Sequence, residues 1–202
     1  MLINSPYVYS ATKSEIELSE RIARARCELK SLHNVKSKKY ATSESEADIH
    51  TLGILGEFAV SVCLGIPLSM PITLRGDSGF DMTSDQIGRI SVKTRSRANY
   101  DFALTPGESN ANWDIGILVC PKGSMVKAPY EFIALRLVGW ITRIDFHQRA
   151  IMRDYGHGSR LAVPNSRLRP MVDIKHPIGT DSVRSSIDRH GLDGAFLEIT
   201  NG

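Results

Sequence analysis

The chain has 202 residues, of which 42% are hydrophobic, and a formal net charge of +3 at pH 7. This length suits one domain with a small extension, and the apolar share is enough for a buried core. The three cysteines are too widely spaced for a disulfide framework or a metal-binding motif, so we expect a reducing, cytoplasmic location. We expect no signal peptide, no membrane-spanning run and no internal repeat.

Two long stretches have the apolar spacing of helices after an irregular lead-in at residues 1–10. Residues 11–33 carry apolar residues at steps of three and four, which predicts one helix with a single apolar stripe. This stripe packs either on the domain or on a second copy of the chain, so a homodimer through the N-terminal helix is one expectation. Residues 47–64 predict a second helix, capped by Ser45 or Ser43 and ended by Gly65 and Pro67.

The rest of the chain alternates between short apolar runs and turns. Residues 106–112 read as a loop, and a helix is expected from near Thr142 to about Met152. Short strands are expected at residues 72–74, 100–104, 113–120, 130–138 and 161–163. The order predicts an α/β (α+β) fold with a mixed central sheet flanked by helices. We divide it into an N-terminal helix and basic loop (1–46), a core (47–178) and a peripheral C-terminal segment (179–202).

The rest of the chain is organised around residues 76–95, which predict two short strands joined by a turn. Side chains alternate along a strand, so Ile90 and Val92 belong in the core. The polar residues of the second strand then lie together on an open face: Ser91, Lys93 and Arg95. Asp81 lies on the first strand, close to that face. A carboxylate beside a lysine on the next strand is a plausible place to hold a hard metal ion and orient a water.

Basic residues are distributed unevenly. Residues 11–40 carry eight Lys or Arg against four Glu, whereas residues 41–70 carry four acids and no Lys or Arg. Residues 89–97 contain four basic side chains and no acid. A basic face beside a carboxylate pocket is what a phosphate-backbone ligand needs, although solvated surface would give the same counts.

Three motifs in this order resemble the PD-(D/E)XK nuclease superfamily, which includes restriction-endonuclease-like, RecB-like and Holliday-junction-resolvase-like enzymes. They are Gly-Glu-Phe-Ala at 56–59, Gly-Phe-Asp at 79–81 and Ile-Ser-Val-Lys-Thr at 90–94. The superfamily pattern is a helix glutamate, a strand aspartate and then acid-X-lysine on the next strand. Glu57, Asp81 and Lys93 match these positions. Taken singly, each fits an ordinary surface role; taken together, their order favours a nuclease-like site.

The resemblance implies a restriction-endonuclease-like fold and phosphodiester hydrolysis of DNA with Mg²⁺ or Mn²⁺. Asp81 and Glu57 would hold the metal, and Lys93 would orient the attacking water. The sequence departs from the pattern at Ser91, where an acid is expected; Asp77 or Asp85 could compensate. The alternative is a catalytically reduced protein on the same fold, which acts as a DNA-binding or protein-interaction module.

The basic residues near the expected site are candidates for contacts with DNA phosphates: Arg89, Arg95 and Arg97, together with Lys36, Lys38 and Lys39 in a polar loop. The six histidines show no helical HxxxH spacing and no pairing with cysteine, which argues against a zinc site. No Gly-rich phosphate loop is present, which argues against an NTPase. A duller alternative is a structural protein whose first helix drives dimerisation.

Overall fold

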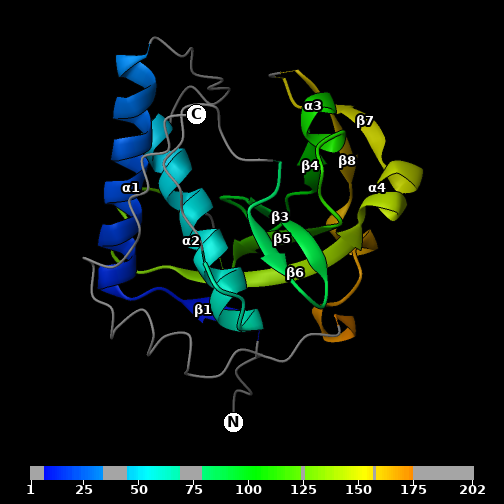
Figure 1. Ribbon diagram of the computed structural model, residues 1–202, viewed down its shortest axis with the longest axis horizontal. Coiled ribbons are helices and arrows are strands. Elements are labelled where there is room, and N and C mark those ends of the chain that lie inside the picture. Colours follow the sequence, from blue (N-terminus) through cyan, green and yellow to red (C-terminus); the bar gives the residue numbers. More distant parts are fainter. Residues whose placement is uncertain (1–6, 34–44, 69–78, 124–125, 157, 175–202) are drawn as a thin grey trace.

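The computed structural model describes residues 7–33, 45–68, 79–123, 126–156 and 158–174. Within these residues a curled, mixed sheet of five strands has the order β1-β6-β5-β3-β2. Two long helices cover one face, and a three-stranded antiparallel sheet, β4-β8-β7, packs toward the other side (Figure 1). The expected mixed α+β architecture, with helices flanking a mixed sheet, is therefore confirmed.

The helices and strands follow the chain in an alternating order. The helices are α1 (Lys13–Leu32), α2 (Glu46–Leu64), α3 (Pro106–Ser109) and α4 (Arg143–Arg149). The strands of the large sheet are β1 (Val8–Ser10), β2 (Met82–Ser84), β3 (Gly88–Thr94), β5 (Ile115–Pro121) and β6 (Ala134–Thr142). The strands of the small sheet are β4 (Phe102–Leu104), β7 (Ile151–Asp154) and β8 (Ser159–Val163).

Both long helices begin at a capping box, and α2 ends at a left-handed glycine. A capping box joins Thr12 and Glu15 at the start of α1, and Ser45 with Asp48 does the same for α2. Each box pairs backbone N–H groups that the first helical turn leaves without partners. At the end of α2, Gly65 adopts φ +66°, a left-handed conformation that glycine adopts without steric cost.

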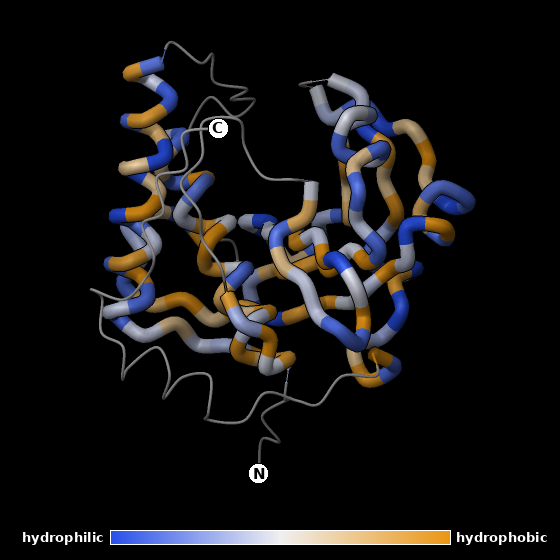
Figure 2. Tube along the Cα trace, viewed as in Figure 1, coloured by the Kyte–Doolittle hydropathy of each residue, from blue (hydrophilic) through white to orange (hydrophobic). Residues whose placement is uncertain are grey.

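Helix α2 is unusually apolar because it is covered on several sides. By length and composition this helix could cross a membrane, although we expected no membrane-spanning run from the sequence. However, 61% of its most apolar 18-residue window is buried inside the fold. A core helix passes the same test. Figure 2 shows the contrast with α1, along which hydrophilic and hydrophobic residues alternate.

The large sheet separates two hydrophobic clusters. Alternation along the central strand β5 directs Ile117 and Val119 toward α1 and α2, and Leu118 and Cys120 toward β4, β8 and α4. The second cluster is built around three aromatic rings in edge-to-face contact, namely Phe102, Trp113 and Phe146. Both faces of β5 are buried, as its continuous apolar run predicts.

The apolar stripe of α1 packs within the chain. Leu18 and Ile22 are buried in the same cluster as the core residues of α2. Toward the end of the helix the stripe becomes exposed, and Leu32 is 78% exposed. The buried half of the stripe is thus used for the contact between α1 and α2, and the expected homodimer stays a prediction.

Several local expectations were wrong. Residues 8–10 are not irregular but form β1, which pairs with β6. The segment expected as a loop at 106–112 begins with α3, and β6 runs four residues beyond the strand end expected at residue 138. The last helix ends at Arg149 instead of near Met152, because β7 begins at Ile151. The strand expected at 72–74 lies outside the described residues.

A close contact fixes the distance between α2 and β3. A Cβ added at Gly56 would lie 1.7 Å from Oγ1 of Thr94, which no side chain permits. Glycine at this position therefore lets the helix backbone rest directly on the strand. Three residues earlier, a Cβ at Gly53 would meet nothing within 4 Å.

We therefore expect Gly56→Ala to lower the free energy of unfolding by about 1–3 kcal/mol, because the new methyl group must push α2 away from β3. Gly53→Ala is the matched control on the same helix. It should raise the free energy of unfolding by about 0.5–1 kcal/mol, because alanine loses less backbone entropy on folding. Urea unfolding of both variants measures the difference, and equal effects would contradict the close contact.

Candidate active site

In the part of the chain that the structure describes, one edge of β3 has no strand partner after Ile90. Strand β2 pairs only with residues 88–90, whereas β5 pairs with Ile90–Thr94 along the opposite edge. Among the described residues, no strand continues the β2 side of the ladder beyond Ile90. We call this edge of β3, beside residues 91–94, the notch; Ser91 and Val92 are buried there, and Lys93 and Thr94 are half-buried.

The carboxylate of Asp81 lies in this notch. The backbone N–H of Val92 donates to Oδ2 of Asp81 at 2.5 Å, and the N–H of Asp81 donates to the carbonyl oxygen of Ile90 at 2.8 Å. The side chain thus takes the place of a missing strand partner. Its acidic group is fixed on the backbone between Ser91 and Lys93, two of the residues that the sequence predicts for the site.

Lys93 points away from α2 and makes an ion pair with an acid that the sequence analysis missed. Its Nζ lies 3.0 Å from Oε1 of Glu108 on α3, and the lysine side chain is 22% exposed. The other carboxylate oxygen of Glu108 accepts from the backbone N–H of Thr105 at 2.7 Å. Burial opposes ionisation, but Lys93 and the hydrogen bonds from Thr105 lower the pKa of Glu108 to about 2.

The position of Glu108 depends on the small sheet and its neighbours. Helix α3 has only four residues, so it cannot persist by itself. The indole N–H of Trp113 donates to the carbonyl oxygen of Glu108 at 3.1 Å. His147 Nε2 of α4 lies 3.1 Å from the carbonyl oxygen of Ser109. The sequence Thr-Pro-Gly-Glu at 105–108 does predict a capping box, but not that its glutamate faces a lysine on another strand.

The face that carries Ser91 is not open, which corrects the sequence expectation. Ser91 is only 5% exposed, and its neighbour on β5 is Gly116. The ring of Phe102 rests on that glycine, because a Cβ there would lie 2.3 Å from the ring. The small sheet therefore covers the start of this face. Lys93 and Arg95, farther along the strand, are half-buried.

Glu57 reaches this region from the other side of the sheet. It follows Gly56, the residue that touches Thr94, so its backbone lies beside the last residues of β3. It is half-buried. The three residues of the predicted motif thus lie on three neighbouring elements but not on one face of the sheet: Glu57 lies on the α2 side, Lys93 points to the α3 side, and Asp81 lies at the sheet edge.

Of the predicted phosphate contacts, Arg89 has a different role at the opposite end of β3. Its Nε and Nη2 donate to the two carboxylate oxygens of Asp114 at 2.9 Å, and its backbone N–H donates to the same group. These bonds lower the pKa of Asp114 to about 2. The pair joins the beginnings of β3 and β5, so Arg89 helps to set the register of the parallel strands.

Arg95 is also engaged within the protein, whereas Arg97 is more accessible. Nη2 of Arg95 donates to the carbonyl oxygen of Ala103 on β4 at 2.6 Å. Burial, with the nearby Arg160, lowers the pKa of Arg95. Arg97 is exposed, and its guanidinium lies 5.6 Å from the ring centroid of Tyr100. The loop lysines 36, 38 and 39 lie outside the described residues.

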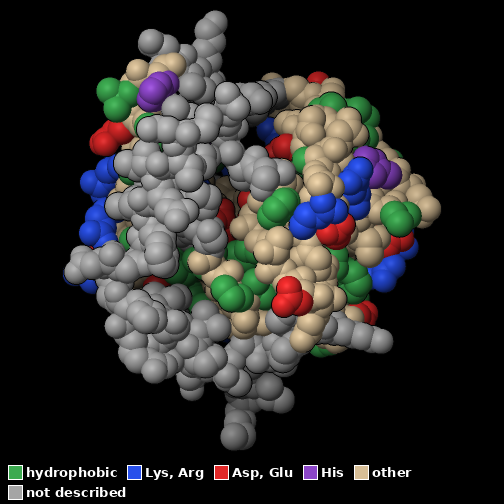
Figure 3. All heavy atoms as spheres, in the orientation of Figure 1, with side chains coloured by type: hydrophobic (Ala, Val, Ile, Leu, Met, Phe, Trp, Pro, Cys, Tyr) green, Lys and Arg blue, Asp and Glu red, His purple; other side chains and the backbone are tan. Residues whose placement is uncertain are grey.

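The visible basic side chains form separate groups. Figure 3 shows Lys and Arg along the outer side of α1 and again on the right-hand side of the view, with acidic side chains nearby.

The donor set at the notch suits a hard cation. Carboxylates such as those of Asp81 and Glu57 are the ligands that Mg²⁺ and Mn²⁺ prefer, and such ions keep several waters, so few protein ligands are needed. Glu108 adds a third acid near Lys93. Among the described residues, however, these three acids do not bring their carboxylate oxygens within 4.8 Å of one another, so they are separate acidic groups near one strand segment and not an assembled three-acid site.

Comparison with known proteins adds no assignment. No protein-family model matches the chain, and no curated protein is significantly similar to it.

The ion pair of Glu108 predicts a specific pH dependence. The folded-state pKa of about 2 lies below the ordinary value of 4.5, so ionised Glu108 stabilises the fold above pH 4.5. This contribution is lost as the pH falls toward 2. Glu108→Gln keeps the capping function but removes the charge. Above pH 4.5 we expect it to lower the free energy of unfolding by at most about 1 kcal/mol, because the glutamate is partly solvated.

Urea unfolding at several pH values measures this effect. The difference between the wild type and Glu108→Gln should shrink between pH 5 and pH 2. Glu131→Gln, a change at an exposed glutamate, is the matched control and should show no such convergence. A difference that stayed constant over this pH range would contradict the ion pair.

Proposed function

We propose that this chain is a metal-dependent DNA nuclease of the PD-(D/E)XK type, which hydrolyses phosphodiester bonds. The observation that carries the proposal is the position of the Asp81 carboxylate, which accepts from Val92 N–H in the middle of the Ser91-Val92-Lys93 segment. The motif aspartate is thus hydrogen-bonded to the residue next to the motif lysine, although twelve positions separate the two in the sequence.

The order of elements also supports a restriction-endonuclease-like arrangement. A helix with the motif glutamate rests on the strand with the motif lysine, through the contact of Gly56 with Thr94. The strand that follows Asp81 pairs antiparallel with β3, and β3 pairs parallel with β5. Helix, hairpin and parallel neighbour are the scaffold that the superfamily resemblance implies.

In this proposal Asp81 and Glu57 hold a Mg²⁺ or Mn²⁺ ion. When bound, such an ion polarises the phosphate and lowers the pKa of a water in its coordination shell. The ammonium of Lys93 orients the attacking water and stabilises the negative charge that develops on the phosphate oxygens. Glu108 holds the Lys93 side chain in place through the ion pair between them. Arg97 contacts a neighbouring phosphate and positions the strand without reading bases.

Two features favour a second candidate, a catalytically reduced module that binds DNA or a protein. Ser91 supplies no carboxylate and is 5% exposed, so a water-filled metal site cannot extend over it. The charge of Lys93 is already balanced by Glu108. Both features are compatible with a fold that has kept its scaffold and lost the third acid of the motif.

Cleavage assays with the Lys93→Ala and Asp81→Asn variants separate these candidates. With Mg²⁺ or Mn²⁺, we expect the wild type to cut DNA and both variants to lose at least about a hundredfold in rate, because each lacks a group that acts on the reacting centre. Lys122→Ala removes an exposed lysine elsewhere and should keep full activity. Chelation of the metal should abolish cleavage.

The decisive result is the behaviour of the unmodified chain on single-stranded, duplex and branched DNA. No cleavage of any of these by folded protein would reject the nuclease. If Ser91→Glu then gained cleavage, the site would be a decayed nuclease site. Salt-sensitive DNA binding without cleavage in either protein would support the binding module.

A further inference from the structure

A second cluster of metal-ligating groups lies between α1 and α2, independent of the proposed nuclease site. Cys27 of α1 and Glu46 and His50 of α2 place their ligand atoms within 4.8 Å of one another, and all three side chains are half-buried. Spacing along the chain did not predict this cluster, because its members come from two helices joined by a long connection. Glu46 and His50 are four residues apart and so share one face of α2.

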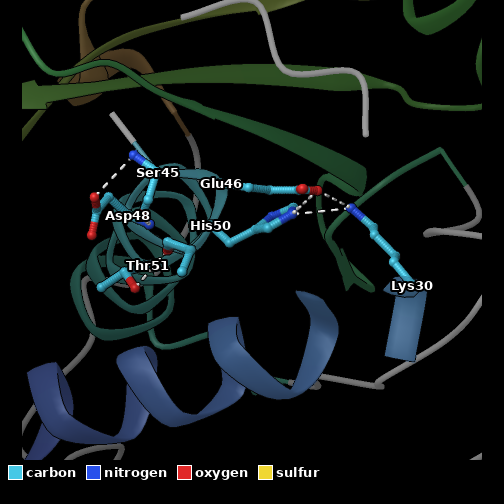
Figure 4. Close-up of polar contacts among 7 residues, drawn as sticks. Lys30, Ser45, Glu46, Asp48, His50 and Thr51 are labelled. Carbon is cyan, nitrogen blue, oxygen red and sulfur yellow. Dashed lines mark hydrogen bonds and ion pairs between the residues drawn. The ribbon is translucent and has the colours of Figure 1, made fainter. Parts of the chain in front are cut away.

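The cluster already holds a positive charge. The ammonium of Lys30 lies 3.1 Å from Oε1 of Glu46 and 3.0 Å from Nε2 of His50 (Figure 4). An ammonium group only donates hydrogen bonds, so Nε2 of His50 must present its lone pair to Lys30. A carboxylate oxygen and an imidazole lone pair thus converge on one cation, with the sulfur of Cys27 beside them.

We propose that Cys27, Glu46 and His50 form a binding site for a transition-metal ion of the zinc type, and that Lys30 occupies this site when no metal is bound. Sulfur, nitrogen and oxygen together select Zn²⁺ or a similar ion over Mg²⁺, which prefers oxygen alone. Three protein ligands leave a fourth position for water. The site is distinct from the notch at β3, where the donors are carboxylates.

Binding has a defined proton balance. A cysteine binds a metal as a thiolate, and a histidine binds it as a neutral imidazole. Metal binding therefore releases one proton from the Cys27 thiol to solvent and needs no proton from His50. The ammonium of Lys30 leaves the centre and turns toward water. The bound ion then links α1 to α2, the two helices that cover the large sheet.

Titration of the metal-free, reduced full chain with Co²⁺ tests the site, because a thiolate ligand gives a charge-transfer band in the near ultraviolet. We expect the band to saturate at one equivalent in the wild type. Cys27→Ser should abolish the band. Cys120→Ala removes a thiol that is buried in the second hydrophobic cluster, so this variant should keep the band. His50→Ala should weaken binding at least about tenfold, because losing even a residue that only hydrogen-bonds a metal ligand typically costs that much.

The Lys30→Met variant separates two explanations of the cluster, a metal site and an ion-pair network, because they predict different effects on Co²⁺ binding. If Lys30 competes with the metal, its removal should tighten Co²⁺ binding at least about tenfold. If the cluster is only an ion-pair network, Lys30→Met should leave binding weak and show no thiolate band. Circular dichroism confirms that each variant is folded.

The effect of Zn²⁺ on the melting temperature tests the site without any measurement of nuclease activity. With Zn²⁺ at about a hundred times its dissociation constant, the melting temperature of the wild type should rise by about 5–10 °C. Cys27→Ser should not respond. Asp81→Asn, which alters the proposed nuclease site, should keep both the thiolate band and the thermal shift. No band in the wild type, or an undiminished band in folded Cys27→Ser, would overturn the proposal.

Discussion

The close contact between α2 and β3 is the constraint on which the rest of the structure depends. Because Gly56 carries no side chain, the helix backbone rests on Thr94, and the motif glutamate that follows is brought beside the end of the strand. Helix α2 packs against the apolar residues Ile90 and Val92 on this face of β3. The second face is then left for the aromatic cluster of the small sheet.

The sheet itself makes the candidate site by ending early on one side. Strand β2 stops pairing after Ile90, and Asp81 satisfies the next backbone donor with its carboxylate. An acid is thereby held at the sheet edge by a hydrogen bond that also completes the strand. The position of this acid is thus fixed by a strand of the fold, and sites built on such rigid elements are more precise than sites on loops.

The sequence predicted what is local and missed what depends on distant contacts. Periodicity and caps located α1, α2 and the hairpin of β2 and β3, and alternation assigned Ser91 and Lys93 to one face. Alternation cannot show what covers a face, so the burial of Ser91 by the small sheet was missed. Glu108 beside Lys93 and Cys27 beside His50 were missed for the same reason, since each pair joins segments that only the tertiary fold brings together.

The ion pair between Lys93 and Glu108 joins two parts of the molecule. The lysine belongs to the large sheet, whereas its acid sits on a four-residue helix that is held by Trp113 and His147. A small shift of that helix breaks the pair and leaves a bare ammonium at the notch. In the proposed nuclease, the charge that a phosphate meets near Lys93 would therefore depend on how firmly Trp113 and His147 hold that helix.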